Sequence, residues 1–337
     1  MMNTIGKILT LTTFGESHGP AMGGILDGMP AGVDIDLDAL QRFVDRRRTG
    51  HTVGSSTRDE RDRVEVLSGI WQGKTLGTPI GFIVRNTDAR SSDYDEIARC
   101  YRPNHADYTW LAKYGIRDPR GGGRASARET VARVVAGGIA VQALDRLGIT
   151  VEACIVQVGP HVGVTAEEQQ RLIAEVAKDG DTLGGIIECV VRGVPAGLGE
   201  PLFGKLHAQL AAAMMSIPSV HGFEYGDGFD MAARRGSEVM DRFERREDGT
   251  IGTATNHSGG IQGGISNGED IVMRIAFKPV PTLMRDLPAV DCDGNPVTLP
   301  PRGRHDACVL PRALPIVEAM AALVILDNHL IKKTNVL

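Results

Sequence analysis

One segment has the apolar spacing of a long helix. Between residues 131 and 144, apolar or small side chains recur every three or four positions, at Val131, Val134, Val135, Gly138, Val141 and Leu144. Ser126 and Glu129 have the spacing of a capping box, which predicts that the helix begins at Ser126. Glu129 and Arg133 are placed to form an ion pair, and Gly148 is placed to end the helix.

Other segments alternate between apolar and polar residues, or run apolar, in the manner of shorter elements. Strands are predicted at residues 8–13, 25–28, 64–70, 78–84, 151–158, 184–191 and 271–277. Helices are predicted at residues 36–48, 166–178, 205–215 and 314–330. No repeat period is visible, and we expect a single domain over residues 1–337. Residues 230–252 are charged and lack apolar periodicity, so we expect a mobile loop there that closes over bound ligand.

The start of the central helix has the features of an anion-binding site. Three glycines, Gly121 to Gly123, precede Arg124, and Arg128 follows within one turn. The free N–H groups and positive dipole end of a helix N-terminus favour phosphate or carboxylate ligands, and both arginines can reach the same place. The alternative is a buried helix behind a flexible loop, which would not need two arginines there.

Composition and charge narrow the class of ligand. The 337 residues are 42% hydrophobic, with 37 basic against 42 acidic residues and a net charge of −5. An overall acidic chain is a poor candidate for a nucleic-acid-binding surface. Because the basic residues are clustered locally, a small and highly charged anion is the better expectation.

Cysteine, histidine and hydropathy patterns indicate a soluble cytoplasmic protein without a metal site. The five cysteines are widely spaced and form no C-x-x-C pair, which favours reduced thiols. The nine histidines include no H-x-x-x-H pair, so no metal site is expected. No signal peptide is recognised, and no apolar run is judged long enough for a membrane span.

The first candidate chemical group lies in Gly15-Glu16-Ser17-His18-Gly19. Its G-x-S-x-G form matches the nucleophile elbow of serine hydrolases, with Ser17 as nucleophile, but an elbow requires a helix directly after the serine. The residues that follow resemble another strand, which argues against a hydrolase. His18 remains a candidate acid–base group, since its ordinary pKa lies near neutrality. The alternative is a histidine that only satisfies loop backbone.

Two further basic segments are candidates for ligand binding. Arg46, Arg47 and Arg48 end the helix predicted at residues 36–48, where they either favour the helix dipole or clamp an anion. In the segment Tyr101-Arg102-Pro103-Asn104-His105-Ala106-Asp107-Tyr108, the proline stiffens the chain before His105, and Asp107 is near enough in sequence to orient it. The aromatic residues nearby suit the wall of a flat ligand or an ordinary core.

Six ordered blocks together resemble chorismate synthases. The first three are residues 15–19, the segment Arg102-Pro103-Asn104-His105-Ala106-Asp107, and Gly123-Arg124-Ala125-Ser126-Ala127-Arg128-Glu129-Thr130. The others are His257-Ser258-Gly259-Gly260-Ile261 with its continuation to Gly268, Lys278-Pro279, and Gly303-Arg304-His305-Asp306-Ala307-Cys308. The blocks occur in the order of the family and span nearly the whole chain.

The resemblance implies a carbon–oxygen lyase that converts 5-enolpyruvylshikimate 3-phosphate to chorismate by 1,4-elimination of phosphate, with reduced FMN required. It implies that His18 protonates the leaving phosphate and that His105 supplies a proton to the reduced flavin. It also implies that Asp306, supported by Ser17 and Ser126, helps to take the proton from flavin N5. The substrate carries one phosphate and two carboxylates, and binding these anionic groups would explain why arginines are clustered in a protein whose net charge is negative.

The resemblance also assigns ligand contacts. FMN contacts fall on Arg124, Ala125, Ser126, Ser219, Gly268, Lys278, Pro279, Val280, Pro281, Thr282 and Arg304. Contacts to substrate or NADP fall on Arg46, Arg47, Arg48, Arg102 and Arg128, with NADPH as a candidate reductant of the flavin.

Three positions depart from the family pattern. Ala125 replaces a usual serine, Pro218-Ser219 replaces a common Asn-Ala, and Val53 replaces a usual arginine for which Arg58 could compensate.

The family resemblance further implies an α+β fold, a layered sandwich with antiparallel sheets inside and helices outside, assembled as a homotetramer.

Two other function classes stay open. One is the serine hydrolase, and the other is a non-catalytic flavin- or anion-binding relative. The retained residues His18, His105 and Asp306 argue against the second.

Overall fold

The computed structural model describes residues 3–48, 61–87, 99–301 and 306–335. Its first sheet has five strands in the order β1-β2-β3-β7-β4, and every neighbouring pair is antiparallel. The alternating apolar positions of this sheet are buried on one face, as at Leu11, Leu26 and Ile80. The strand bounds are β1 Thr4–Ile5, β2 Thr10–Gly15, β3 Ala21–Asp27, β4 Val64–Val66 and β7 Ile80–Arg85.

The second sheet also has five antiparallel strands, in the order β10-β9-β11-β17-β12. Strand β17 shows the strict alternation that its sequence predicted, with Ile271, Met273, Ile275 and Phe277 buried on one face. The bounds are β9 Thr150–Val158, β10 His161–Val162, β11 Gly185–Arg192, β12 Val220–Tyr225 and β17 Ile271–Phe277.

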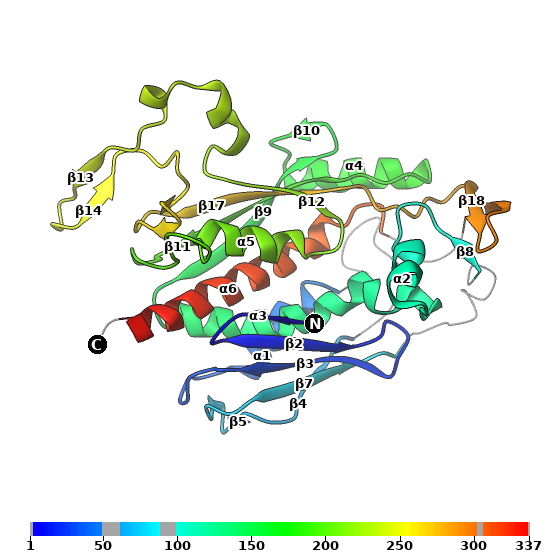
Figure 1. Cartoon of the computed structure of the whole chain (residues 1–337), viewed down its shortest axis with the longest axis horizontal. Coiled ribbons are helices and arrows are strands. Elements are labelled where there is room, and N and C mark those ends of the chain that lie inside the picture. The colour runs from blue at the N-terminus through cyan, green and yellow to red at the C-terminus, as the bar shows by residue number, and fades with distance from the viewer. Residues whose placement is uncertain (1–2, 49–60, 88–98, 302–305, 336–337) are drawn as a thin grey trace.

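Two long helices lie between the sheets, α3 (Thr130–Asp145) and α6 (Leu310–Asn335) (Figure 1). Helix α3 packs mainly on β2, β3 and β7 and also touches β9, α6 packs on β9 and β11, and the two helices pack against each other. The α+β class with antiparallel sheets is confirmed. The expected layer order differs, however, because these helices are inside and the sheets outside. Helices α1 (Leu37–Asp45) and α5 (Leu206–Met215) pack on α3 and α6, respectively.

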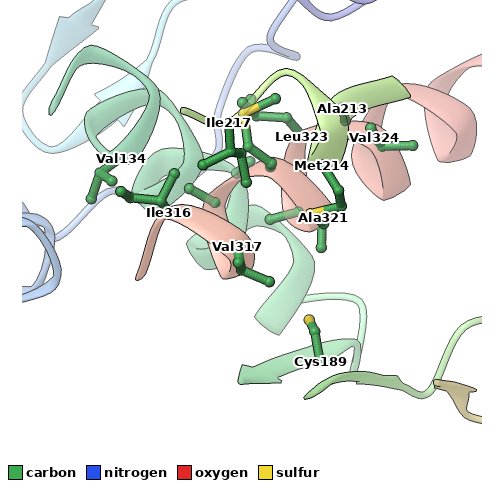
Figure 2. Close-up of a cluster of buried hydrophobic side chains, with 14 of the residues drawn as sticks. Val134, Cys189, Ala213, Met214, Ile217, Ile316, Val317, Ala321, Leu323 and Val324 are labelled. Carbon is green, nitrogen blue, oxygen red and sulfur yellow. The ribbon is translucent and has the colours of Figure 1, made fainter. Parts of the chain in front are cut away.

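The helix layer is apolar around nearly its whole circumference, which explains its central place. Figure 2 shows side chains of α3, α5 and α6 meeting in one cluster that includes Val134, Met214 and Val317. A Cβ atom at Gly137 would lie 2.2 Å from the Cβ atom of Ala319, so this glycine sets the close approach of α3 to α6. Helix α6 is long and apolar enough to cross a membrane, but 78% of that apolar window is buried in the protein core.

The start of the central helix differs from the capping-box prediction. Ser126 does act as an N-cap, but for the 3-10 turn Ala127–Glu129, where its side chain accepts from the Arg128 N–H. The α-helix begins at Thr130, four residues after the predicted start. Glu129 forms the predicted ion pair with Arg133, at 2.8 Å, rather than reaching back to the cap. This tight turn places residues 124–128 beside the glycine loop.

The expected mobile loop contains regular structure. The arm formed by residues 228–253 has two 3-10 segments, Gly228–Ala233 and Gly236–Glu238, and an antiparallel pair, β13 (Phe243–Arg245) and β14 (Ile251–Thr253). It projects from one end of the molecule (Figure 1). Its strands are mostly exposed, so apolar periodicity is not required of them.

The remaining elements are short or lie at the edges. Helix α2 (Asp107–Tyr114) and strands β8 (Cys100–Tyr101), β18 (Leu287–Asp291) and β19 (Pro296–Leu299) gather at the end of the molecule opposite the arm (Figure 1). The others are β5 Ile70–Trp71, β6 Lys74–Thr75, β15 Ile261–Gln262, β16 Ile265–Ser266, the 3-10 segment Arg120–Ala125 and helix α4 Ala166–Lys178.

Candidate active site

A pocket of about 930 Å³ lies where the N-terminal ends of α3 and α6 meet the turn between β2 and β3. Its wall comes from residues far apart in the sequence, mainly in the ranges 102–110, 116–128, 218–219, 278–282 and 306–312. Among the described residues the wall holds eight cationic side chains against five acidic ones. The pocket therefore favours anions, and its volume is in the range of small-molecule sites.

The glycine loop forms one wall and requires its glycines. Gly121, Gly122 and Gly123 all have positive φ, which other residues rarely adopt. A Cβ atom at Gly121 would lie 2.4 Å from the His18 ring and 2.9 Å from Ser17 Oγ. The Ser17 N–H donates to the Gly123 carbonyl at 3.3 Å. The loop thus packs directly on the Ser17–His18 turn, as a close backbone approach demands.

Ser17 does not have the geometry of a hydrolase nucleophile. Strand β2 ends at Gly15 and the chain turns directly into β3 from Ala21, without an intervening helix. Ser17 is 1% exposed, which leaves little room for attack on an external ester or amide. The nucleophile-elbow interpretation is therefore not supported.

Asp62 joins two arginines beneath the pocket. Its carboxylate pairs with Arg47, at 3.1 Å, and with Arg128. Arg47 also donates through Nε to Thr130 Oγ1 at 2.9 Å and through its second terminal nitrogen to the Ala127 carbonyl at 3.0 Å. Burial raises the pKa of Asp62, but the two guanidinium groups outweigh it and hold that pKa below its usual value. The network fixes the 3-10 turn before α3.

The three consecutive arginines have different surroundings. Only Arg47 lines the pocket. Arg46 makes two hydrogen bonds to Glu318 inside the apolar face of α6, one of them 2.8 Å long, and the Ala153 N–H also donates to that carboxylate, at 3.1 Å. Arg48 lies 3.8 Å from Asp45. The structure thus gives Arg46 a core partner and leaves Arg47 as the member placed at the pocket.

The expected partnership of Asp107 with His105 is replaced by arginine pairs. Asp107 accepts from Arg102 Nε at 2.8 Å and from Arg117 at 2.7 Å. His105 Nδ1 lies 2.9 Å from the Pro103 carbonyl, which can only accept, so Nδ1 carries a proton. His105 Nε2 lies 3.2 Å from Thr282 Oγ1.

The expected flavin contacts are only partly gathered in the pocket. Arg124, Ala125, Ser126, Ser219, Lys278, Val280, Pro281 and Thr282 line it. Arg124 is anchored on β2, where it donates to the Thr13 carbonyl at 2.8 Å. Pro279 and Gly268 are described but are not among the lining residues, and neither is His18, whose ring lies behind Gly121. Arg304, Val53 and Arg58 lie outside the described residues.

Several pocket residues were missed by the sequence analysis. Arg312 pairs with Asp306, and Arg120 forms a hydrogen bond with Asp118 at 2.8 Å. Glu16 also lines the pocket, where burial raises its pKa against the attraction of Arg124. Arg312 follows Asp306 by only six residues, so a search for opposite charges near the last block would have found it. The sequence near Asp62 does not indicate its pairing, because its partners Arg47 and Arg128 are distant in the sequence.

The lining chemistry fits a flavin mononucleotide together with an anionic substrate. The cationic side chains suit a phosphate and carboxylates. Trp110, Ile116, Val280, Pro281 and Val309 provide apolar surface for a flat ring system. Within the described part of the chain no three His, Cys, Asp or Glu side chains lie close enough to hold a metal ion. All five cysteines are free thiols, three of them buried.

Comparison with known proteins places these features in a family context. A sequence model described as chorismate synthase matches residues 9–330. The chorismate synthase of Parabacteroides distasonis is 54% identical over 356 residues, covering 99% of each chain, and that of Phocaeicola vulgatus is 51% identical with the same coverage. A solved crystal structure of a chorismate synthase has a TM-score of 0.77 at 30% identity, covering 97% of this chain and 93% of that one.

Proposed function

Because this chain belongs to the chorismate synthase family, we propose that it converts 5-enolpyruvylshikimate 3-phosphate to chorismate and phosphate by 1,4-elimination, with reduced FMN required. Membership makes the chain an enzyme of chorismate formation, a lyase in aromatic amino acid biosynthesis. The identity of the substrate and the cofactor is the proposal. The observation that carries it is a cation-rich pocket that also contains His105 and Asp306.

The anionic groups of substrate and FMN account for the charge of the pocket. Arg102, Arg124 and Arg128 line the same pocket as the glycine loop and are each held by a protein acceptor. Guanidinium groups fixed in this way bind phosphate or carboxylate without losing further side-chain entropy. Each charge-assisted hydrogen bond contributes about 1.5–3 kcal/mol. We assign Arg47 to the same subsite, as the residue that braces the turn carrying Arg128.

Bound reduced FMN would supply electron density that weakens the bond to the leaving phosphate. The protein groups move the protons. By the family resemblance His18, whose ring packs against Gly121, donates to the leaving phosphate, and His105, when both ring nitrogens are protonated, supplies a proton from Nε2, beside Thr282. The Asp306 carboxylate accepts a proton, supported by the hydroxyl groups of Ser17 and Ser126. Such acid–base steps typically contribute about 10²–10⁴-fold each.

We also propose a cytoplasmic homotetramer that uses NADPH as a candidate reductant. Free thiols are typical of a reducing compartment. Apolar side chains are exposed on or beside the first sheet, among them Phe14, Ile25, Leu67 and Trp71, and apolar exposure of this kind favours assembly. Light scattering should give four times the mass of one chain, and a monomer at working concentration would contradict the assembly.

Anaerobic turnover decides the activity. With chemically reduced FMN we expect chorismate and phosphate to form in equal amounts, and with oxidised FMN alone we expect none. NADPH plus FMN in place of chemical reduction tests whether the chain reduces its own flavin. FMN binding without turnover would favour the non-catalytic relative, and labelling of Ser17 by a serine-hydrolase probe would favour the hydrolase.

A further inference from the structure

Asp306 is fixed in the pocket wall from its C-terminal side. The next residue, Ala307, accepts a hydrogen bond from the Leu183 N–H at 2.9 Å, and Cys308 forms a parallel bridge with Leu183. Asp306 itself is 9% exposed, so its carboxylate has little freedom to sample other directions. Backbone anchoring sets where this side chain begins, but the direction of the carboxylate plane needs a side-chain partner.

Within the described part of the chain, Arg312, in the first turn of α6, is such a partner. One terminal guanidinium nitrogen donates to Asp306 Oδ2, while Nε donates to the Arg47 carbonyl at 2.9 Å. The guanidinium is planar, so two hydrogen bonds to groups on different segments fix its plane. The same plane then fixes the direction of the Asp306 oxygen that it binds.

Arg312 occupies a helix position that is unfavourable for a positively charged side chain. A cation in the first turn opposes the helix dipole, which favours anions there. Arg312 also lies near one other cation, Arg47, whose positive charge repels it, and near the Asp62 carboxylate, which attracts it. An arginine in this position needs a compensating carboxylate, and Asp306 is the one it binds.

We propose that Arg312 is a positioning residue for proton transfer, which acts by holding the Asp306 carboxylate in the direction of the reacting atoms. The inference rests on the proposed function, in which Asp306 accepts a proton. Because Arg312 acts through Asp306, its loss reduces the rate of the chemical step more than it weakens substrate binding. A direct substrate contact would instead raise KM.

The test compares Arg312→Gln, Asp306→Asn and the double variant with chemically reduced FMN. We expect Arg312→Gln to lower kcat about tenfold to hundredfold, in line with the usual effect of a misplaced group, with KM changed less than threefold. The double variant should be no slower than Asp306→Asn alone, because the two groups act as one unit. Added guanidinium ion should restore part of the kcat of Arg312→Gln, and Arg312→Lys should retain more activity than Arg312→Gln.

Two readouts apart from turnover separate positioning from damage to the fold. The affinity for oxidised FMN, measured by fluorescence, and the thermal unfolding midpoint should stay close to those of the unaltered protein. Arg85→Gln is a matched control, since it removes an arginine paired with Glu65 on the surface, away from the pocket.

Three outcomes would overturn the inference while leaving the function intact. They are multiplicative losses in the double variant, a rise in KM without a fall in kcat, and failure of both guanidinium and Arg312→Lys to restore turnover. Absence of chorismate formation by the unaltered protein would instead contradict the proposed function itself.

Discussion

At the residue scale, the pocket depends on buried charges that neutralise one another. The carboxylate of Asp62 is 1% exposed and lies between Arg47 and Arg128. Both guanidinium groups are cations, so removal of the carboxylate leaves two buried positive charges without their shared partner. The arrangement is therefore costly to break, even though a buried ion pair contributes little net stability by itself.

The first prediction concerns Asp62→Asn. At pH 7 we expect the free energy of unfolding to fall by about 3–5 kcal/mol, the usual cost of breaking a buried pair. Because the pKa of Asp62 is held below its ordinary 3.8 in the folded protein, its stabilising contribution is present above pH 3.8 and is lost as pH falls through the folded pKa. Urea titrations at descending pH should show the two proteins converging. Glu65→Gln on the surface is the control, and an equal effect there would contradict the prediction.

The second prediction concerns the two histidines. His18→Ala and His105→Ala should each reduce turnover at least about tenfold while FMN still binds, consistent with lost proton transfer. The exposed His161→Ala is the matched control and should have no effect. Near-normal turnover in both variants would remove the acid–base assignment, and loss of FMN binding would indicate a structural role.

At the scale of elements, packing and helix propensity make opposite demands on α3. Propensity favours alanine over a helix-interior glycine by about 0.8–1.0 kcal/mol. Gly137, however, faces the backbone of α6, and an added Cβ atom would lie 2.4 Å from the Ala319 Cα atom. A backbone contact cannot move aside as the end of a flexible side chain can, so the packing cost of about 1–3 kcal/mol or more should dominate.

The third prediction is therefore that Gly137→Ala destabilises the protein, measured as a lower urea midpoint or as loss of soluble protein. Gly236→Ala in the arm is the control, because no atom lies within 4 Å of the added Cβ there and its φ is not positive. Greater stability of Gly137→Ala would mean that α3 and α6 can move apart to make room for the methyl group, contrary to their close contact at Gly137 and Ala319.

At the scale of the whole molecule, the arm and the pocket are far apart. No described residue between 228 and 253 lines the pocket, and Figure 1 shows β13 and β14 at the opposite end from α2. The arm is therefore not placed to close the pocket of its own chain, which revises the expectation of a lid at residues 230–252. Whether it is mobile stays a prediction from its charged composition.

The fourth prediction follows from that separation. Hydrogen exchange should slow in the glycine loop, residues 120–129, when FMN and substrate bind, because that loop forms the pocket wall. Exchange in residues 230–252 should change little. Strong ligand-dependent protection confined to the arm would restore the lid interpretation or place the arm at a neighbouring subunit's pocket.

The sequence alone determined the features that depend on near neighbours. The period of α3, the alternation of β17 and the Glu129–Arg133 pair all arise from residues within a few positions of one another. The glycine loop and the His105 segment were recognisable for the same reason, because the residues that set their backbone conformation are consecutive in the sequence. The six ordered blocks then identified the family.

The tertiary structure decided what depends on distant residues. Arg46 and Glu318 are 272 positions apart, so no local pattern could reveal that this arginine has a core partner. The pairs of Asp62 and the coupling of Arg312 to Arg47 also join separate segments. The layer order was undetermined because an apolar helix satisfies the same pattern on either side of a sheet. Only the packing of α3 on the first sheet and of α6 on the second, with the two helices against each other, shows that both helices lie inside.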